Sequence, residues 1–500
     1  MNKPLYFLGI DNGGTLSKAA LFGADGVEVA SASRRIELIE VQPGWSERSA
    51  TAMWLDSAAA IREVLERSAI DPSDIAAIAC TGHGNGLYLV DGNGVPVRNA
   101  INSTDGRAAD IAARWQHDGT AAKALPLTAQ CVWPAQPNTL LAWLIEHEPE
   151  TIARATAVLF AKDFTRLQLT GEVWAELTDM SGSSLMNVVT GQYDDNVLAL
   201  FGISECKRLL PPIKKSHDLC GCVTAEAAAA TGLTVGTPVA GGMFDIDACG
   251  LASGIVSEEQ MSLVSGTWGN NQYISRAPLI DKDLFMTSCY SMPGWYLMLE
   301  GSPTSASNLE WFVSQVLNET DPATGPSRHA RGDALVAALG EPSLDTPIFL
   351  PFVYGCNLPS PAPAAFVGLK ASHGRAEMLR AVYEGVVFAH FTHLKRLLEF
   401  RPPPASIRFT GGVARSRIWV QMFADCFQIP IEIPAGSELG ALGAAIAAAV
   451  AIGHYPDYPA AVNAMTRIAQ RHQPNASRGQ VYQQKFSRYL ATATAMAAIR

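Results

Sequence analysis

The sequence predicts an α/β protein with two related lobes and a ligand-binding cleft between them. The chain has 500 residues, which is more than one hydrophobic core usually supports, so two domains are expected. Strand-like apolar runs alternate with helix-like stretches, as is typical of the α/β class. A glycine-rich turn near the N-terminus also has a counterpart about half a chain later. Ligand sites are common between domains, which places the expected cleft there.

The first half begins with two strands and continues as an α/β alternation. The expected strands are 6–11, 19–22 and 75–81, and the expected helices are 49–68, 139–146 and 152–156. A second α/β cycle starts near the segment Pro238-Val239-Ala240-Gly241-Gly242. We therefore place the domain boundary there, with an N-terminal lobe at 1–241 and a C-terminal lobe at 242–500.

The second half has strands and one long helix of its own. The expected strands are 260–264, 296–300, 347–350 and 406–410. The helix covers about 377–400 and ends before Pro402-Pro403-Pro404, because proline cannot continue a helix. The runs 75–82 and 406–412 both read as strands that end in Thr-Gly, and each lies well downstream of the glycine-rich turn in its half. This repeat supports two related lobes.

The composition excludes several classes of protein. Hydrophobic residues make up 48% of the chain and charged residues only 17%, which is typical of a compact soluble protein. The excess of 47 acidic over 37 basic residues argues against a nucleic-acid surface, which needs clustered Lys and Arg.

The cysteines and the apolar runs indicate where the protein is found. The nine cysteines are odd in number and scattered, so we expect reduced thiols in a cytoplasm. The sequence begins without a charged-then-apolar leader, and its longest run of small apolar residues, 440–453, is shorter than the roughly 20 residues that a bilayer requires. A cytoplasmic protein without a membrane segment is therefore expected.

The N-terminal turn has the residue types of a phosphate cradle. The segment from Gly9 to Lys18 reads Gly-Ile-Asp-Asn-Gly-Gly-Thr-Leu-Ser-Lys. Its glycines let the backbone bend so that successive N–H groups converge on one anion, and Thr15, Ser17 and Lys18 add donors and charge. Asp11 suits a Mg²⁺ site, directly or through water.

The second turn, Ser265-Gly266-Thr267-Trp268-Gly269, follows the apolar run 261–264. Neither turn has the spacing of a P-loop or of a dinucleotide-binding fingerprint. Either turn alone is more often a plain β-hairpin. Their recurrence in corresponding halves favours one nucleotide held between the two lobes.

Asp245 is our candidate for the catalytic base. It follows an expected strand and the pair Gly241-Gly242 at the junction of the lobes. Phosphoryl transfer to a sugar hydroxyl needs a base for the hydroxyl proton, with donors and Mg²⁺ around the travelling group. Two alternatives remain: Asp245 caps the following helix, as aspartate often does, or Asp247 is the base.

Two polar loops at strand ends are candidates for sugar binding. They read Thr-Gly-His-Gly-Asn-Gly over 81–86 and Asn-Ser-Thr-Asp-Gly-Arg over 102–107. Such segments are also common as ordinary turns. His83 alone is given no catalytic role, and His390 and His393 read as helix-face residues without a third metal ligand.

These motifs resemble the FGGY carbohydrate kinases, which belong to the superfamily of sugar kinases, Hsp70 and actin. The resemblance runs nearly end to end. The segment 11–18 looks like the family's first phosphate motif, and Gly266 with Thr267 looks like its second. The segment 411–416, Gly-Gly-Val-Ala-Arg-Ser, is similar to the adenosine motif, and 364–369 with 377–384 fits the C-terminal signature.

The resemblance implies two ribonuclease-H-like lobes around a catalytic cleft, with sugar held mainly by the first lobe and ATP with Mg²⁺ mainly by the second. Asp245 takes the position of the catalytic base, and Asp247 falls where relatives often carry a neutral residue. The implied sugar-binding residues are Gly84, Asn85, Asp105 and Asp245. The implied metal ligands are Asp11 and Asp245. The implied ATP-binding residues are Gly13, Thr15, Ser17, Lys18, Gly266, Thr267, Gly411, Gly412 and Ser416.

Departures from the family pattern bear on the substrate. Gly84 and Asn85 fall where D-xylulose kinases usually present Met-His, and Gly14 replaces a frequent Thr or Ser. The segments 42–48, 302–305, 308–312 and 349–352 look most similar to the L-xylulose kinase branch.

The expected function is thus an ATP-dependent kinase for the terminal hydroxyl of a ketopentose, with L-xylulose favoured. D-xylulose, 3-keto-L-gulonate and erythritol are the alternative substrates. A chaperone-like or filament-forming ATPase and a sugar-binding regulator are the alternatives of other classes. The expected partners are the sugar and ATP, and a homodimer is compatible with the family, many of whose members are dimers.

Overall fold

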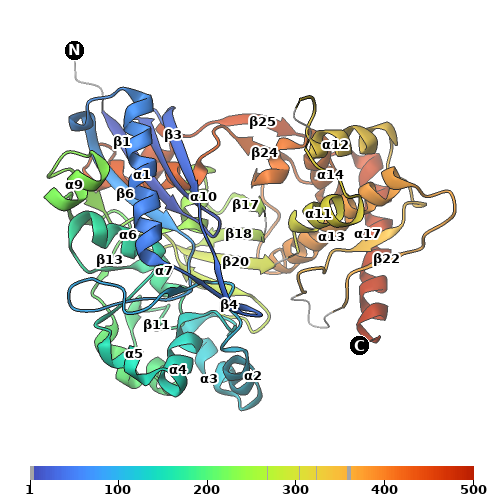
Figure 1. The fold of residues 1–500 in the computed structure, drawn as a ribbon. Coiled ribbons are helices and arrows are strands. Elements are labelled where there is room, and N and C mark those ends of the chain that lie inside the picture. Colours follow the sequence, from blue (N-terminus) through green and yellow to red (C-terminus); the bar gives the residue numbers. More distant parts are fainter. Residues whose placement is uncertain (1–4, 267, 303, 322–323, 357–361, 500) are drawn as a thin grey trace. The chain divides into compact units, whose positions relative to one another are not determined.

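The computed structural model describes residues 5–266, 268–302, 304–321, 324–356 and 362–499. Their backbone contacts divide them into two compact units, neither of which is continuous in sequence (Figure 1). Unit 1 comprises the described parts of Met1–Val256, Ile274–Met298 and Gly436–Arg467. Unit 2 comprises the described parts of Ser257–Tyr273, Leu299–Ala435 and Ile468–Arg500.

A mixed sheet forms the centre of unit 1. Its strand order is β14-β15-β6-β1-β2-β3, and β16 also pairs with β6. β1 runs antiparallel to β2 and parallel to β6. The strands are β1 (Tyr6–Asn12), β2 (Leu16–Gly23), β3 (Glu28–Arg35), β6 (Ile75–Gly82), β14 (Leu219–Cys222), β15 (Pro238–Ala240) and β16 (Met243–Phe244).

Two helices of unit 1 show why the sequence packs in this way. α1 (Ala50–Ser68) begins where the Ser49 hydroxyl accepts a hydrogen bond from the Ala52 N–H at 3.1 Å, which satisfies a free helix donor. α15 (Leu439–Ala451) is rich in alanine and glycine. A Cβ on Gly9 of β1 would lie 2.9 Å from the Ala441 Cα, so only small residues allow this close approach of α15 to the sheet.

The rest of unit 1 contains most of its helices, several of which pack around a second apolar core. Its helices are α2 (Ala109–His117), α3 (Thr120–Thr128), α4 (Pro137–His147), α5 (Pro149–Arg154), α6 (Ala161–Thr170), α7 (Leu177–Ser181), α8 (Asp195–Leu200), α9 (Ala225–Thr231), α10 (Asp245–Ala252) and α16 (Tyr458–Met465). Its short strands are β4 (Ile39–Gln42), β5 (Trp45–Arg48), β7 (Tyr88–Val90), β8 (Ala100–Ile101), β9 (Ala157–Leu159), β10 (Ala175–Glu176), β11 (Met186–Asn187), β12 (Gln192–Tyr193), β13 (Ile213–Lys214) and β19 (Met286–Cys289).

Unit 2 is also built on a mixed sheet. β17 (Gln260–Ser265) runs antiparallel to β18 (Gly269–Ser275) and parallel to β23 (Ser406–Thr410). β24 (Ile431–Pro434) and β25 (Ile468–His472) extend the sheet beyond β23. β20 (Tyr296–Ser302) lies beside β18 in this sheet, and β21 (Ile348–Leu350) pairs with β22 (Ala365–Val367). The α-helices are α11 (Ser307–Trp311), α12 (Arg328–Ala338), α13 (Arg375–Leu397), α14 (Arg417–Phe427) and α17 (Ala476–Ala497).

The two sheets share one arrangement. In unit 1 the β1–β2 hairpin lies beside parallel β6, and Asp11 pairs with Thr81. In unit 2 the β17–β18 hairpin lies beside parallel β23, and Val264 pairs with Thr410. The α/β class with two related sheets is therefore confirmed, and so are the two Thr-Gly strands.

The two units are not divided where the lobes were predicted to meet. α15 and α16 come from the C-terminal part of the chain, yet they belong to unit 1. Contacts define these units, whereas the lobes 1–241 and 242–500 were placed where a second α/β cycle starts in the sequence, so that division stays a prediction. Among the described residues, no helix combines the length and the apolar composition that crossing a bilayer requires.

Candidate active site

The first glycine turn joins β1 to β2 in unit 1. The Gly13 N–H donates to the Leu16 carbonyl at 3.0 Å, and Gly14 and Thr15 are exposed at the tip. The turn thus has the geometry of a β-hairpin, which was the alternative to a phosphate cradle, and its backbone is accessible at the tip. Phosphate binding by Gly13, Thr15 and Ser17 stays a prediction.

The Asp11 side chain lies in a polar environment beside this turn. Lys18, its partner across the hairpin, forms an ion pair with Glu438 at 2.9 Å. The Oδ1 atom of Asp11 is buried and has no hydrogen-bond partner, while a Cβ on Gly440 would lie 2.5 Å from its Oδ2. Burial raises the pKa of Asp11 to about 6 against the opposing effect of Lys18. A buried carboxylate oxygen without a donor suits a bound cation.

Asp245 is the first residue of α10, and its side chain is partly accessible. The helix cap is Phe244, without a side-chain hydrogen bond, so the capping role considered for Asp245 is not the one observed. Burial, and then the nearby carboxyl groups of Asp11 and Asp179, raise the pKa of Asp245 well above its usual range. Asp179 already has Lys162 3.0 Å away, so a bound cation would mainly offset the repulsion between Asp245 and Asp11.

The residues around Asp11 and Asp245 fit Mg²⁺ held partly by other groups. Among the described residues, no group of three or more His, Cys, Asp or Glu side chains could hold a metal ion without further ligands. Mg²⁺ is commonly bound through one or two carboxylates together with substrate phosphates and water. The arrangement therefore suits a metal that arrives with a nucleotide.

Asp247 differs from Asp245 in its environment. It is fully buried, and its Oδ1 accepts a hydrogen bond from the Ser291 N–H at 3.0 Å. This bond ties α10 to the segment that follows β19. The geometry gives Asp247 an anchoring role and leaves Asp245 the more accessible carboxyl of the two.

The first sugar-loop candidate packs directly against the residue before Asp245. A Cβ on Gly84 would lie within 2.8 Å of three carbons of the Phe244 ring, so glycine lets the loop and the start of α10 touch. Asn85 has a left-handed backbone, with φ of 59°, and its buried Oδ1 has no partner. Burial, followed by Arg48, lowers the pKa of His83 to about 3, so this imidazole is neutral.

Asp105 is held both by its own loop and by β5. Its carboxylate accepts hydrogen bonds from the Ser46 N–H at 2.6 Å and from the Arg107 Nε at 2.9 Å. The Arg107 guanidinium lies 4.6 Å from the Trp45 ring centroid and 5.3 Å from that of Trp143. These contacts fix the loop, and sugar binding by Asp105 stays a prediction.

A buried ionic cluster near Asp245 was not predicted. Lys162 lies 3.1 Å from Asp163 and 3.0 Å from Asp179, and Arg166 lies 3.0 Å from Asp163. Arg166 also donates to the Gly241 carbonyl at 2.5 Å, so the cluster holds the segment that leads to Asp245. Its signal in the sequence is the pair Lys162-Asp163 directly after the apolar run 157–161.

The second glycine turn joins β17 to β18 in unit 2. The Gly266 carbonyl accepts from the Ala306 N–H at 3.0 Å, and the Ser265 and Ser305 hydroxyls lie 2.9 Å apart. His390 lies beside Ser305, with its Nε2 3.1 Å from the hydroxyl. Thr267, predicted to bind ATP, lies outside the described residues.

Gly411 and Gly412 end β23 beside this turn. Gly411 has φ of 93°, and a Cβ there would lie 2.6 Å from the Ser265 carbonyl carbon, so two predicted ATP-binding segments meet at Ser265. Ser416 caps α14 by accepting from the Trp419 N–H at 3.2 Å, and it donates to Asp333 at 2.8 Å. ATP binding by Gly266, Gly411, Gly412 and Ser416 stays a prediction.

The comparisons with known proteins decide the family. The N-terminal domain of the FGGY family of carbohydrate kinases matches residues 6–251, and its C-terminal domain matches 261–452. The chain belongs to the FGGY family. This confirms the family inferred from the motifs, and with it a carbohydrate kinase, which is a phosphotransferase.

Similar FGGY proteins cover nearly the whole chain. A protein of Escherichia coli (strain K12) named L-xylulose/3-keto-L-gulonate kinase is 39% identical over 97% of this chain and 96% of its own length. A protein of Pasteurella multocida (strain Pm70) named probable L-xylulose kinase is 37% identical over 99% of each. The crystal structure of xylulose kinase from Rhodospirillum rubrum is 29% identical, covers 99% of each chain and superposes with a TM-score of 0.86. The two-lobe sugar kinase fold is thereby confirmed.

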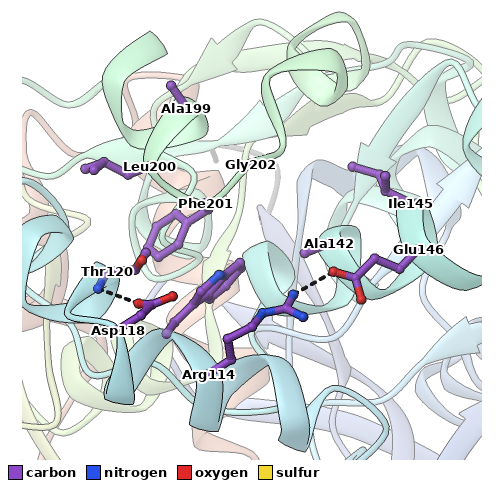
Figure 2. Close-up of a pocket in the computed structure, with 11 residues that line it drawn as sticks. Arg114, Asp118, Thr120, Ala142, Ile145, Glu146, Ala199, Leu200, Phe201 and Gly202 are labelled. Atoms are coloured by element: carbon purple, nitrogen blue, oxygen red, sulfur yellow. Dashed lines mark hydrogen bonds and ion pairs between the residues drawn. The ribbon is translucent and has the colours of Figure 1, made fainter.

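A surface pocket of this FGGY kinase lies among helices of unit 1. It has a volume of about 310 Å³ and is bordered by α2, α4 and α8 (Figure 2). Trp115 and Phe201 pack together there with ring centroids 4.7 Å apart, and Arg114 pairs with Glu146 at 2.6 Å. None of the candidate residues lines this pocket, so it is separate from the chemistry considered above.

Proposed function

We propose that this chain is an ATP-dependent kinase that phosphorylates the terminal hydroxyl of a ketopentose, with L-xylulose as the preferred substrate. The observation that carries the proposal is the end-to-end similarity to proteins named L-xylulose kinase. The partly accessible Asp245 carboxyl beside Asp11 supplies chemistry that suits this reaction.

Asp245 acts as the general base in this proposal. It accepts the proton of the terminal hydroxyl while that oxygen attacks the γ-phosphorus of ATP in line. A carboxyl whose pKa is raised by burial holds a proton better near neutral pH than an exposed carboxyl does. Its position at the first residue of α10, behind the fixed segment 241–244, keeps the carboxyl in one place.

Both glycine turns are assigned to nucleotide binding in this proposal. Backbone N–H groups of both turns, together with Lys18 and the hydroxyls of Thr15 and Thr267, are proposed to face the phosphates. Asp11 and Asp245 would hold Mg²⁺, which supplies positive charge to the phosphate oxygens when it is bound. The unpartnered Oδ1 of Asp11 supports this assignment.

The sugar is proposed to lie at the loop of Gly84 and Asn85. The buried Asn85 Oδ1 has no protein partner, and a sugar hydroxyl satisfies such an acceptor. Gly84 contacts the Phe244 ring, which brings this loop next to Asp245. Asp105 is proposed to contribute to sugar binding by holding the conformation of its loop.

A substrate panel tests the proposal. ATP-dependent ADP release is measured with L-xylulose, D-xylulose, L-ribulose, D-ribulose, 3-keto-L-gulonate, erythritol and glycerol, and with no sugar as the control. We expect the highest kcat/KM with L-xylulose. A higher value with D-xylulose or 3-keto-L-gulonate would reassign the substrate within the family, and ADP release that no sugar raises above the control would contradict the kinase proposal for this panel.

A further inference from the structure

Arg48 lies between the first glycine turn and the loop of Gly84 and Asn85, the proposed nucleotide and sugar sites. It is the last residue of β5, and its side chain is only 1% exposed. Its Nη1 donates to the Gly13 carbonyl in the first glycine turn at 3.0 Å, and its Nη2 contacts the Met53 sulfur. The guanidinium carbon lies 5.6 Å from the centroid of the Tyr88 ring.

Tyr88 continues this connection to the sugar loop. Its hydroxyl lies 3.1 Å from the His83 Nε2, and the His83 Nδ1 lies 3.4 Å from the Gly84 carbonyl. A carbonyl can only accept, so Nδ1 carries the proton, and Nε2 then accepts from the Tyr88 hydroxyl. The His83 N–H also donates to the Asn12 carbonyl at 3.0 Å. We call Arg48, Tyr88 and His83 the bridging network.

Arg48 is unusual among the buried arginines of unit 1. Arg107 lies 2.9 Å from the Asp105 carboxylate and Arg166 lies 3.0 Å from that of Asp163. Within the described part of the chain, no carboxylate forms an ion pair with Arg48. A guanidinium does not lose its charge in a protein, and a buried charge without a counterion is costly. A phosphate at the first glycine turn would provide the missing negative charge.

We propose that Arg48 is a positioning residue that, through Tyr88 and His83, links sugar binding at Gly84 and Asn85 to nucleotide binding at the first glycine turn. The inference rests on the proposed function, since it takes the sugar and the nucleotide to bind at these two places. A sugar that shifts the Gly84 carbonyl acts on His83, then on the Tyr88 hydroxyl and the guanidinium beside it. Arg48 in turn holds the Gly13 carbonyl and so the conformation of the turn.

This link has a thermodynamic consequence. If the sugar strengthens nucleotide binding by some factor, the nucleotide strengthens sugar binding by the same factor. Such factors are typically about 5–150, and we expect about 10 here. Removing the bridging network should bring the factor close to one while leaving the fold intact.

The test is isothermal titration calorimetry on the full-length protein. The dissociation constant of a non-hydrolysable ATP analogue with Mg²⁺ is measured with and without saturating L-xylulose, and their ratio is the linkage factor. Arg48→Met removes the charge and the donors at similar length. Tyr88→Phe removes only the hydroxyl and is the gentler change, so it decides the test if Arg48→Met fails to fold.

Unit 1 offers a matched control for each variant. Among the described residues, Arg208 donates only to carbonyls, those of Ala155 at 2.8 Å and Ile152 at 2.6 Å, so Arg208→Met controls for the loss of a carbonyl-bound guanidinium. The Tyr193 hydroxyl donates to the Pro211 carbonyl at 2.8 Å, so Tyr193→Phe controls for the loss of a tyrosine hydroxyl.

The proposal expects a factor of about 10 in the unmodified protein and in both controls, and a factor within twofold of one in Arg48→Met and Tyr88→Phe. A factor near one in the unmodified protein, or an unchanged factor in folded Tyr88→Phe, overturns it. Sugar-dependent ADP release by the unmodified protein is measured in parallel. Its absence with every sugar of the panel is a failure of the proposed function, whereas normal release with an unchanged factor in Tyr88→Phe is a failure of this inference alone.

Discussion

Gly84→Ala is the substitution whose effect the structure determines most directly. The added Cβ would lie within 2.8 Å of three carbons of the Phe244 ring, whereas carbon atoms in ordinary contact are about 3.5–4.0 Å apart. Two of these carbons would be closer than 2.8 Å, so the ring must retreat by more than about 0.7 Å. The Phe244 N–H donates to the Thr178 hydroxyl at 2.9 Å, which restrains the backbone, and Asp245 follows directly.

The size of the effect follows from two known costs. Extra atoms in a close-packed interior cost about 1–3 kcal/mol of stability. A displacement of about 1 Å near the reacting groups can lower the rate about 100-fold. We therefore expect Gly84→Ala to lower kcat about 10- to 100-fold, with thermal unfolding only a few degrees lower. The assay is sugar-dependent ADP release, with the unfolding temperature measured on the same samples.

Two further variants make this prediction specific. At Gly92 an added Cβ would meet only the Thr156 Cγ2, at 3.9 Å, so Gly92→Ala should behave as the unmodified protein does. Phe244→Leu removes ring atoms and should restore part of the activity of Gly84→Ala. A Gly84→Ala enzyme within twofold of the unmodified kcat would refute the reasoning, because the ring and Asp245 would then be independent of this glycine.

Three other predictions concern stability. Burial lowers the pKa of both His83 and His390 to about 3, against about 6.5 when unfolded. Below pH 6.5 the unfolded chain therefore binds more protons than the folded chain, and stability should fall toward pH 3 by about 1.4 kcal/mol per pH unit for each histidine. Thermal unfolding at pH 7.5 and 5.0 should show a smaller loss of stability in His390→Asn than in the unmodified protein. Gly411→Ala combines φ of 93° with a Cβ 2.6 Å from the Ser265 carbonyl carbon. At Gly453 φ is 71° but the space around a Cβ is open, so Gly453→Ala should lower the free energy of unfolding by about 1–2 kcal/mol. Urea unfolding should show a larger loss of stability for Gly411→Ala. Lys162→Met leaves the Asp179 carboxylate without its cation, while Asp163 keeps its ion pair with Arg166. The change should cost about 3–5 kcal/mol in urea unfolding, and a loss below 1 kcal/mol would contradict the role given to the cluster.

Each strand and helix that the local sequence pattern predicted has a counterpart in the fold, although most of the short elements were not predicted. The apolar run predicted as a strand over 75–81 is β6 (Ile75–Gly82), and the helix predicted over 377–400 is α13 (Arg375–Leu397). The membership of α15 in unit 1 was not predictable in this way. It depends on the contact between Gly9 and Ala441, two residues far apart in sequence whose small size matters only once they meet.

The sequence predicted where the candidate site residues lie in the fold better than it predicted their hydrogen bonds and ion pairs. The carboxyl of Asp245 does lie at the start of a helix after a short strand. The sequence could not show that Asp105 is held by Ser46 and Arg107, because these bonds depend on how loops meet in space. The buried cluster around Lys162 was missed for the same reason: charged residues are expected at the surface unless their partners are known.

The measurement that tests the central claim most directly is sugar-dependent ADP release by Asp245→Asn, beside Asp247→Asn as its control. An asparagine at 247 can keep the hydrogen bond from the Ser291 N–H, so that variant should retain most of its turnover. The account predicts that Asp245→Asn lowers kcat about 100- to 10,000-fold while the dissociation constant for ATP stays within a few-fold of the unmodified value. Near-normal turnover by Asp245→Asn, or a greater loss in Asp247→Asn, would contradict it.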